Sequence, residues 1–280
     1  MFISIVLLLI VIANTAWTED ISISKKWEAK GFEHPESVVF DTSRNISYVS
    51  NINGEPDKHD SNGYISKLGM DGKIVEKKWI TGLDAPKGLV IYKNILYVSD
   101  INRLVAIDTI KGKIIHEYEA KDAKFLNDVT VDCVGNVYVS DMNDNAIYRL
   151  KNNKFSIWLK DENLGSPNGL CIEYNKLFVV TVTDNKGAGN VKVIDICSKC
   201  YHVYAPEGPF GTLDGIETDG KGGFFITDWN AGKLYYLGAN KKTLEIKSFN
   251  QGSADIEYLP RKKLLFVPLM LDNEVVLFSL

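Results

Sequence analysis

A short pattern repeats six times along the sequence, and this repetition limits the possible folds more than any other feature. Each copy opens with a short run that alternates apolar and polar residues, continues through a turn, and closes on a second apolar run. The closing run is clearest at residues 48–51, 97–100 and 138–141, which read Tyr-Val-Ser followed by Asn or Asp. We take the second residue of each copy as its marker, and the six markers are Glu36, Lys87, Asn127, Asn168, Asp214 and Ala254.

The spacing of the markers identifies the kind of repeat. Successive markers are 51, 40, 41, 46 and 40 residues apart. A period of about 40 to 50 residues built from short strands is typical of the four-stranded blades of a β-propeller. Residues 145–150, 191–196 and 233–237 supply third strands, and no stretch has the sustained periodicity of a capped helix. We therefore predict an all-β fold, a six-bladed β-propeller with four antiparallel strands per blade.

The sixth blade lacks one strand at the end of the chain. After the sixth copy only residues 274–280 remain to form a strand, so this blade has three. Residues 21–29 are the one strand-like run before the first copy. We expect them to become the outer strand of the sixth blade, which closes the ring and covers an exposed edge. The propeller would then be a single domain over residues 17–280.

The N-terminal segment reads as a signal peptide. Residues 3–13 form an apolar run of 11 residues, whereas a membrane-spanning helix needs about 20. Small residues follow this run, and we place the end of the signal peptide at Ala16, so that it covers residues 1–16. We expect export to the periplasm or the exterior, with no membrane span after removal of the signal. An uncleaved N-terminal anchor is the alternative.

Composition and charge restrict the class of partner. Hydrophobic residues make up 45% of the 280 residues and charged residues 24%, as in a globular chain with a sizeable core. The chain has 32 basic and 36 acidic residues, a net charge of −4, so electrostatics give no reason to expect nucleic acid as a partner. We expect a monomer that acts on a small-molecule substrate.

Two of the four cysteines are close together in the sequence. Cys197 and Cys200 are separated by two residues and lie between two strand-like runs, where a hairpin loop would bring them within bridging distance. A redox motif would need a βαβ context, and a zinc site would need a second pair of ligands. We therefore expect a local structural disulfide.

The markers are the candidate functional residues. The first strand of each blade lies nearest the propeller axis, so the markers should meet at one face. Four of them carry oxygen donors, namely Glu36, Asn127, Asn168 and Asp214. Oxygen ligands without sulfur or imidazole suit a hard cation such as Ca²⁺, which takes about six to eight of them. The alternative is that polar residues begin these strands simply because turns are polar.

The marker motifs also carry a resemblance. Residues 35–36, 127–128, 167–169 and 214–215 resemble the corresponding motifs of the SMP-30/gluconolactonase/LRE-like family of six-bladed β-propellers, with diisopropylfluorophosphatase and the paraoxonases as more distant relatives. The resemblance covers essentially the whole chain after residue 16. It implies that the four oxygen-bearing markers hold one catalytic divalent cation, calcium in the first place and zinc as the alternative. It also implies that Asp128 lies beneath the cation and orients the amide ligands.

The resemblance implies a hydrolase. The cation would polarise the carbonyl of a lactone or ester, or the phosphoryl oxygen of a phosphoester, for attack by water. Asp214 would be the general base or the nucleophile. Phe125, however, stands where gluconolactonase-type members carry a substrate-binding Arg, which argues against a sugar lactone. Phe125 and Trp229, which follows Asp228, are the candidate walls of the substrate pocket.

Lys87 is a second difference from the family's motifs, because it adds a positive charge to a marker position. Three interpretations remain open. Lys87 pairs with Asp100 at the end of the neighbouring strand, or it loses its proton and acts as a catalytic base, or it replaces the cation between Glu36 and Asp214. Two other functions therefore stand beside the metal-dependent hydrolase. One is a metal-free site like that of the strictosidine synthases, and the other is a non-enzymatic binding propeller of the NHL kind.

Overall fold

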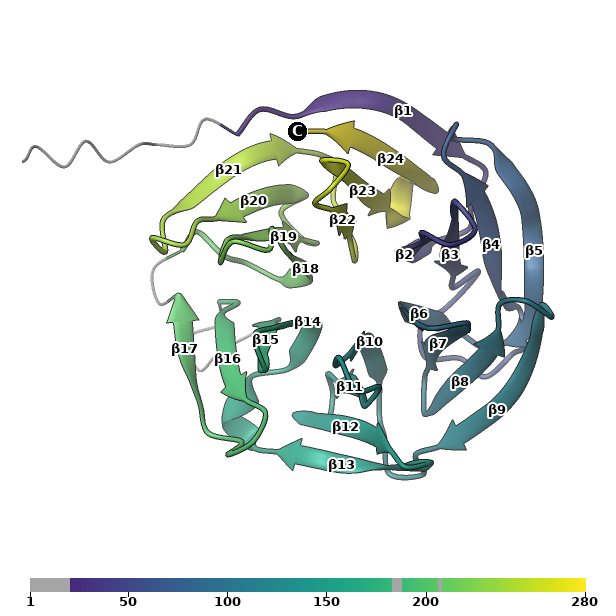
Figure 1. The fold of residues 1–280 in the computed structure, drawn as a ribbon, viewed down its shortest axis with the longest axis horizontal. Helices are drawn as coiled ribbons and strands as arrows, with labels where there is room; N and C mark the ends of the chain where they lie inside the picture. Colours follow the sequence, from purple (N-terminus) through teal and green to yellow (C-terminus); the bar gives the residue numbers. More distant parts are fainter. Residues whose placement is uncertain (1–20, 183–187, 206–207) are drawn as a thin grey trace, which may run out of the picture.

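The structure is a computed structural model that describes residues 21–182, 188–205 and 208–280. These residues form 24 strands in six sheets of four antiparallel strands. The sheets stand as blades around a central axis (Figure 1), which confirms the predicted six-bladed β-propeller. The predicted signal peptide, residues 1–16, lies outside the described residues. Within the described residues, no helix has the length and apolar character that a membrane span requires.

The first three blades each use four consecutive strands, ordered from the axis to the rim. Blade 1 consists of β2 (Pro35–Asp41), β3 (Ile46–Asn51), β4 (Gly63–Gly69) and β5 (Ile74–Leu83). Blade 2 consists of β6 (Pro86–Tyr92), β7 (Ile95–Asp100), β8 (Arg103–Asp108) and β9 (Lys113–Glu119). Blade 3 consists of β10 (Leu126–Val131), β11 (Val137–Asp141), β12 (Ala146–Lys151) and β13 (Lys154–Lys160).

The other three blades complete the ring. Blade 4 consists of β14 (Pro167–Glu173), β15 (Lys176–Thr181), β16 (Val191–Asp195) and β17 (Tyr201–Ala205). Blade 5 consists of β18 (Leu213–Thr218), β19 (Phe224–Asp228), β20 (Lys233–Leu237) and β21 (Thr243–Ser248). Blade 6 consists of β22 (Glu257–Leu259), β23 (Leu264–Leu269), β24 (Glu274–Ser279) and β1 (Ser24–Lys30). Two short 3-10 helices are η1 (Glu162–Leu164) and η2 (Met270–Asp272).

The N-terminal strand closes the ring as predicted. β1 pairs antiparallel with β24, so the two ends of the chain share the sixth blade (Figure 1). Trp27 on β1 packs edge-on against Phe266 of the same blade, and its indole N–H donates to the carbonyl of Met70 in blade 1 at 2.9 Å. This side chain therefore joins the last blade to the first.

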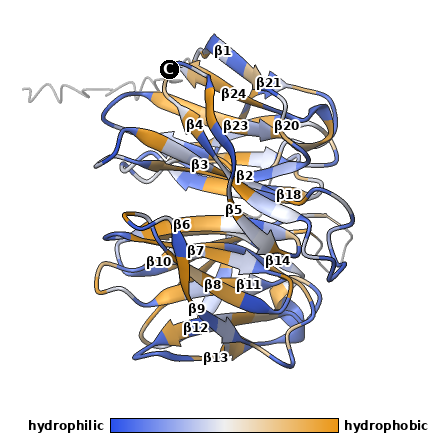
Figure 2. Ribbon diagram, turned by 90° about the vertical axis from the view of Figure 1, so that its right-hand side faces the viewer, coloured by the Kyte–Doolittle hydropathy of each residue, from blue (hydrophilic) through white to orange (hydrophobic). Residues whose placement is uncertain are grey.

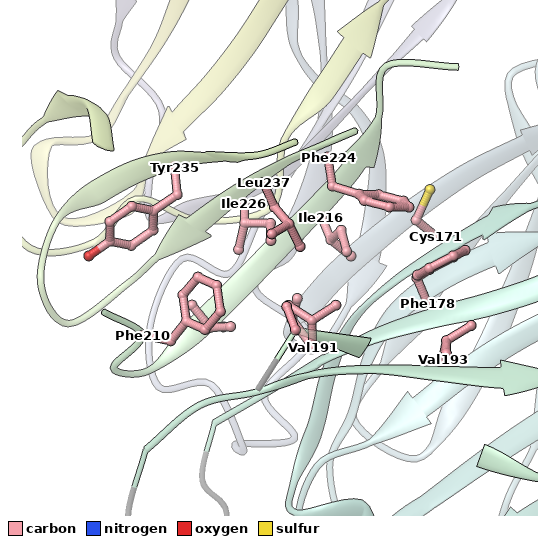
Figure 3. Close-up of a cluster of buried hydrophobic side chains, with 13 residues drawn as sticks. Cys171, Phe178, Val191, Val193, Phe210, Ile216, Phe224, Ile226, Tyr235 and Leu237 are labelled. Atoms are coloured by element: carbon pink, nitrogen blue, oxygen red, sulfur yellow. The ribbon is translucent and has the colours of Figure 1, made fainter. Parts of the chain in front are cut away.

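Burial decreases from the axis to the rim. All seven residues of β2 are buried, whereas most residues of the outer strands β9 and β21 are exposed or half-buried. The reason is that inner strands are covered on both faces by the neighbouring blades. Figure 2 shows hydrophobic residues along the stacked strands. Figure 3 shows one of the hydrophobic clusters between blades, which includes Phe178 of blade 4 and Phe224 of blade 5. The ring centroids of these two residues are 4.4 Å apart.

The inner strand of blade 6 differs from the prediction. The sixth copy of the pattern placed a strand start at Ser253 and Ala254, but β22 begins only at Glu257. Ser253 forms an isolated bridge with Leu269, and Ala254 donates its amide to the carbonyl of Pro268. Proline has no N–H with which to return a bond, so regular pairing stops beside Pro268.

The expected disulfide between Cys197 and Cys200 is also wrong, because both are free and exposed in the structure. Asp195 organises this turn instead. Its carbonyl accepts the amide of Lys199, its amide donates to the carbonyl of Cys200, and its carboxylate accepts the amides of Cys197 and Ser198. The hairpin therefore closes through backbone and carboxylate hydrogen bonds.

Candidate functional site

The markers lie in β-bulges at the starts of the inner strands. In blades 1 to 5 the inner strand gains one residue relative to its neighbour at the marker, for example between Pro35 and Val38. A bulge changes the direction in which side chains point and is common beside active sites. In blades 1, 3 and 5 the amide freed by the bulge donates to a hydroxyl of the second strand, from Ser37 to Ser50 and from Asp128 to Ser140 at 2.9 Å, and from Gly215 to Thr227 at 2.8 Å. This explains the Ser or Thr in three of the closing runs.

The acidic residues that end the second strands hold in place the segments that lead into the inner strands. Asp100 accepts the backbone amides of Asp84 and Ala85, which precede Lys87. Asp141 accepts the amides of Lys124 and Phe125 in the same way. Carboxylates that accept backbone amides hold a loop in one conformation. These residues act as supports for the segments that carry the markers.

The four oxygen-bearing markers surround one cavity. It has a volume of about 230 Å³, and Glu36, Asn127, Asn168 and Asp214 line it together with Lys87. All five side chains are at most 8% exposed. Phe125 and Trp229, the predicted walls, also line it. Side chains from separate blades, far apart in the sequence, thus meet at the axis as the sequence pattern predicts.

The two amides are fixed by hydrogen bonds. Asn127 donates from Nδ2 to Oδ1 of Asn168, whose own Nδ2 donates to the carbonyl of Leu213 at 3.1 Å. This arrangement leaves Asn127 Oδ1 buried without a hydrogen-bond partner, and Glu36 Oε2 is in the same condition. Buried oxygens without partners are costly, so at a cavity they favour the binding of a ligand or ion that completes their coordination.

A second layer of carboxyl groups lies beneath the markers. Asp128 accepts the amides of Val129 and Leu170, so it connects blade 3 to blade 4. Asp255 accepts the hydroxyl of Ser37 at 2.6 Å, and burial and the charge of Asp255 raise the pKa of Asp128. Sequence analysis did not identify Asp255. The signal was present, because Asp255 follows the marker of the sixth copy as Asp128 follows Asn127.

The carboxyl groups have raised pKa values. Burial raises the pKa of Glu36 well above its usual range, and the charges of Asp214, Asp255 and Asp128 raise it further. Burial and the charge of Asp255 likewise raise the pKa of Asp214. Burial raises the pKa of Asp255 to about 7, although hydrogen bonds such as that from Ser37 oppose the change. Crowded carboxylates in a buried site need protons or a counter-cation.

Lys87 supplies a positive charge beside this cluster. Its ammonium is buried and donates to the carbonyls of Pro56 at 2.7 Å and Ala85 at 3.0 Å, and it lies 4.3 Å from the ring centroid of Phe125. Burial lowers the pKa of Lys87 to about 8, while the charges of Glu36 and Asp100 oppose this change.

The predicted pairing of Lys87 with Asp100 is not present among the described residues. Asp100 instead binds the guanidinium of Arg103, at 2.7 Å, and the two amides already described. The backbone of Ala85 lies between them, because its amide donates to Asp100 and its carbonyl accepts from Lys87. Asp100 thus positions Lys87 through Ala85.

The residues fit a cation bound by oxygen ligands. Two carboxylates and two amides face one cavity, and two of their buried oxygens have no other partner. A cation there would also favour the ionised forms of Glu36 and Asp214. Within the described residues, no group of three or more His, Cys, Asp and Glu side chains is placed to hold a metal ion. The two asparagine amides are therefore essential to the proposed set of ligands.

Comparisons with known proteins place the chain by its fold. No family model matches the sequence, and no curated protein matches it. Among solved structures, a gluconolactonase from Xanthomonas campestris is 12% identical, with 90% of this chain and 87% of that chain covered and a TM-score of 0.70. A structure described as a putative gluconolactonase is 16% identical, with coverage of 92% and 91% and a TM-score of 0.68.

A virginiamycin B lyase from Staphylococcus aureus is also similar, at 16% identity, with 92% of this chain and 100% of that chain covered and a TM-score of 0.66. The protein is a six-bladed β-propeller. It matches gluconolactonases and virginiamycin B lyase over nearly its whole length, at low sequence identity.

Proposed function

We propose that the protein is a divalent-cation-dependent hydrolase of lactones, with esters and phosphoesters as related substrates. The observation that carries the proposal is the convergence of Glu36, Asn127, Asn168 and Asp214 on one cavity, with two buried oxygens that lack a hydrogen-bond partner. The structural likeness to gluconolactonases supports it at the level of the fold. These are features of a binding site for a polar reacting group.

Some residues of the cavity would bind the cation, and one of them would also transfer a proton. The four oxygen-bearing markers would hold the cation, and calcium suits these ligands better than zinc. When bound, the cation supplies Lewis-acid polarisation of the substrate carbonyl. Asp214 would accept a proton from water as the water oxygen bonds to the carbonyl carbon, and return it to the leaving oxygen as the C–O bond breaks.

Lys87 would donate to the substrate. An ammonium has three N–H groups, and two of them donate to Pro56 and Ala85. The third can reach an oxygen of the substrate inside the cavity that Lys87 lines. Because the ammonium is buried, its electrostatic effect on a developing negative charge is stronger than it would be in water.

Turnover of a lactone and aryl-ester panel by calcium-loaded protein tests the proposal. We expect Asp214→Asn to lower kcat about 100-fold or more, since one group that moves a proton contributes about that much. The matched control is Asp122→Asn, which changes an exposed aspartate and should leave turnover and folding unchanged. A non-enzymatic binding propeller would turn over none of the substrates in either form.

A second candidate is cleavage by elimination, with Lys87 as the base and no metal. The lowered pKa of Lys87, about 8, favours it, because a buried amine with such a pKa can accept a proton near neutral pH. Reaction in H₂¹⁸O separates the two candidates. Hydrolysis places one labelled oxygen in the acid product, whereas elimination places none and leaves a double bond.

We also propose that the protein is exported and monomeric. The apolar run at residues 3–13 supports export. Cell fractionation, N-terminal sequencing of the mature protein and its mass in solution test these two points. A protein retained in the cytoplasm, or one that forms stable dimers, would contradict them.

A further inference from the structure

The six blades share a feature that sequence analysis did not identify. In every blade, the residue that follows the second strand is apolar, although the strand itself ends on a polar residue in five of the six. These residues come directly after β3, β7, β11, β15, β19 and β23, and they are Ile52, Ile101, Met142, Val182, Trp229 and Met270.

Five of these residues are held by the same hydrogen bond. The backbone amide of each donates to the carbonyl of the residue two positions before the marker, at distances of 2.8 to 3.2 Å. The pairs are Ile52 with His34, Met142 with Phe125, Val182 with Ser166, Trp229 with Thr212, and Met270 with Gly252. The backbone thus places five apolar side chains at equivalent points around the axis.

The same five side chains line the cavity above the markers. We call them the apolar collar: Ile52, Met142, Val182, Trp229 and Met270. Blade 2 breaks the pattern, because Ile101 has a φ of 56° and packs with Ile52 and Ala85 instead. Lys87 occupies the cavity wall in blade 2, where the collar has no residue, and its ammonium lies over the ring of Phe125.

The cavity is therefore polar at its floor and largely apolar in its walls. The markers offer hydrogen bonds and charge to one end of a ligand, while the collar, Phe125, Pro56 and Thr212 surround the rest. A polyhydroxylated ligand would place hydroxyl groups against walls whose described residues offer few partners, and each buried hydroxyl without a partner costs free energy. An alkyl or aryl group would gain free energy from the same walls.

We propose that the cavity selects lactones or esters that carry a small alkyl or aryl group, and that it rejects polyhydroxylated sugar lactones. This inference rests on the proposed function and names its substrate class. The volume of about 230 Å³ is below the range of about 300–1,000 Å³ that drug-sized ligands occupy, so the substrate is small. A monocyclic lactone with a short chain, or a bicyclic aryl lactone, has the right character.

Three six-membered lactones test the selection in the calcium-loaded protein: δ-octalactone, dihydrocoumarin and glucono-1,5-lactone. We expect kcat/KM to be at least about 100-fold higher for the first two, since discrimination of this size follows from apolar walls and unpaired hydroxyls. The near-isosteric variants Met142→Gln and Met270→Gln should each lower kcat/KM for δ-octalactone about tenfold, mainly through KM. The control Ile110→Asn, at an apolar residue that is 68% exposed, should leave kcat/KM and KM for δ-octalactone unchanged.

Binding of a lactam separates this inference from the proposed function. The lactam 6-propylpiperidin-2-one has the shape of δ-octalactone and resists hydrolysis, so calorimetry measures its affinity whether or not the protein is a hydrolase. If no lactone or ester is turned over, the proposed function fails. The inference then survives only if the lactam binds and the two glutamine variants weaken binding. Preference for glucono-1,5-lactone, or the absence of lactam binding, would overturn it.

Discussion

Replacing Lys87 by methionine should change how the stability of the protein depends on pH. The ammonium is 1% exposed, and burial lowers its pKa from 10.5 to about 8. Below pH 8 the side chain is charged in both the folded and the unfolded protein. Between pH 8 and 10.5 the unfolded chain binds this proton more strongly, so the free energy of unfolding rises with pH in this window.

The size of the effect follows from the two pKa values. The difference between 10.5 and about 8 corresponds to about 3 kcal/mol. Lys87→Met cannot titrate, so the wild-type protein should gain about 3 kcal/mol relative to the variant as the pH rises from 8 to 10.5. Glu36 acts in the same direction, because Lys87 lowers the pKa of Glu36 and the variant loses this effect.

Guanidinium denaturation at closely spaced pH values, in the presence of a chelator, measures the difference. The control is Lys87→Arg, whose charge does not titrate in this range, so the wild-type protein should also gain stability relative to Lys87→Arg in the window. A constant difference between the wild-type protein and both variants from pH 8 to 10.5 would contradict this expectation. It would mean that Lys87 is not desolvated in the folded protein.

Three further substitutions test the way the blades are joined. Gly169→Ala should destabilise the protein by about 3 kcal/mol or prevent folding, because a Cβ there would lie 2.0 Å from the carbonyl oxygen of Asp214; denaturation measures this. Ser37→Ala should cost about 1–2 kcal/mol and raise the pKa of Asp255, which titration by NMR would detect. Trp27→Ala should lower the free energy of unfolding by about 2–3 kcal/mol, since it removes contacts that close the ring; an unchanged denaturation midpoint would contradict that role.

The repeat predicts the fold because a propeller is built from one unit used six times. Marker spacing fixes the number of blades, and the single unpaired run before the first copy fixes how the ring closes. The same regularity explains why Glu36, Asn127, Asn168 and Asp214 meet at one cavity. These features depend on periodicity and topology, which a sequence expresses directly.

Other features depend on local contacts that a sequence does not express. The partners of Lys87 are backbone carbonyls of Pro56 and Ala85, whose positions are set by the loop between β4 and β3 and by Asp100. The turn at Cys197 closes through Asp195 although a disulfide was equally compatible with the spacing. The collar residues could have been found from the sequence, since they occupy one position of the repeat. The structure adds the backbone hydrogen bonds that turn this position toward the cavity.

The location of a bound cation shows whether the four oxygen-bearing markers form one metal site. An anomalous difference map from a calcium-soaked crystal should show one strong peak on the propeller axis. We expect oxygens of Glu36, Asn127, Asn168 and Asp214 to surround this peak at about 2.3–2.6 Å. A map with no peak between these four side chains at saturating calcium, or with a peak only elsewhere on the molecule, would contradict it.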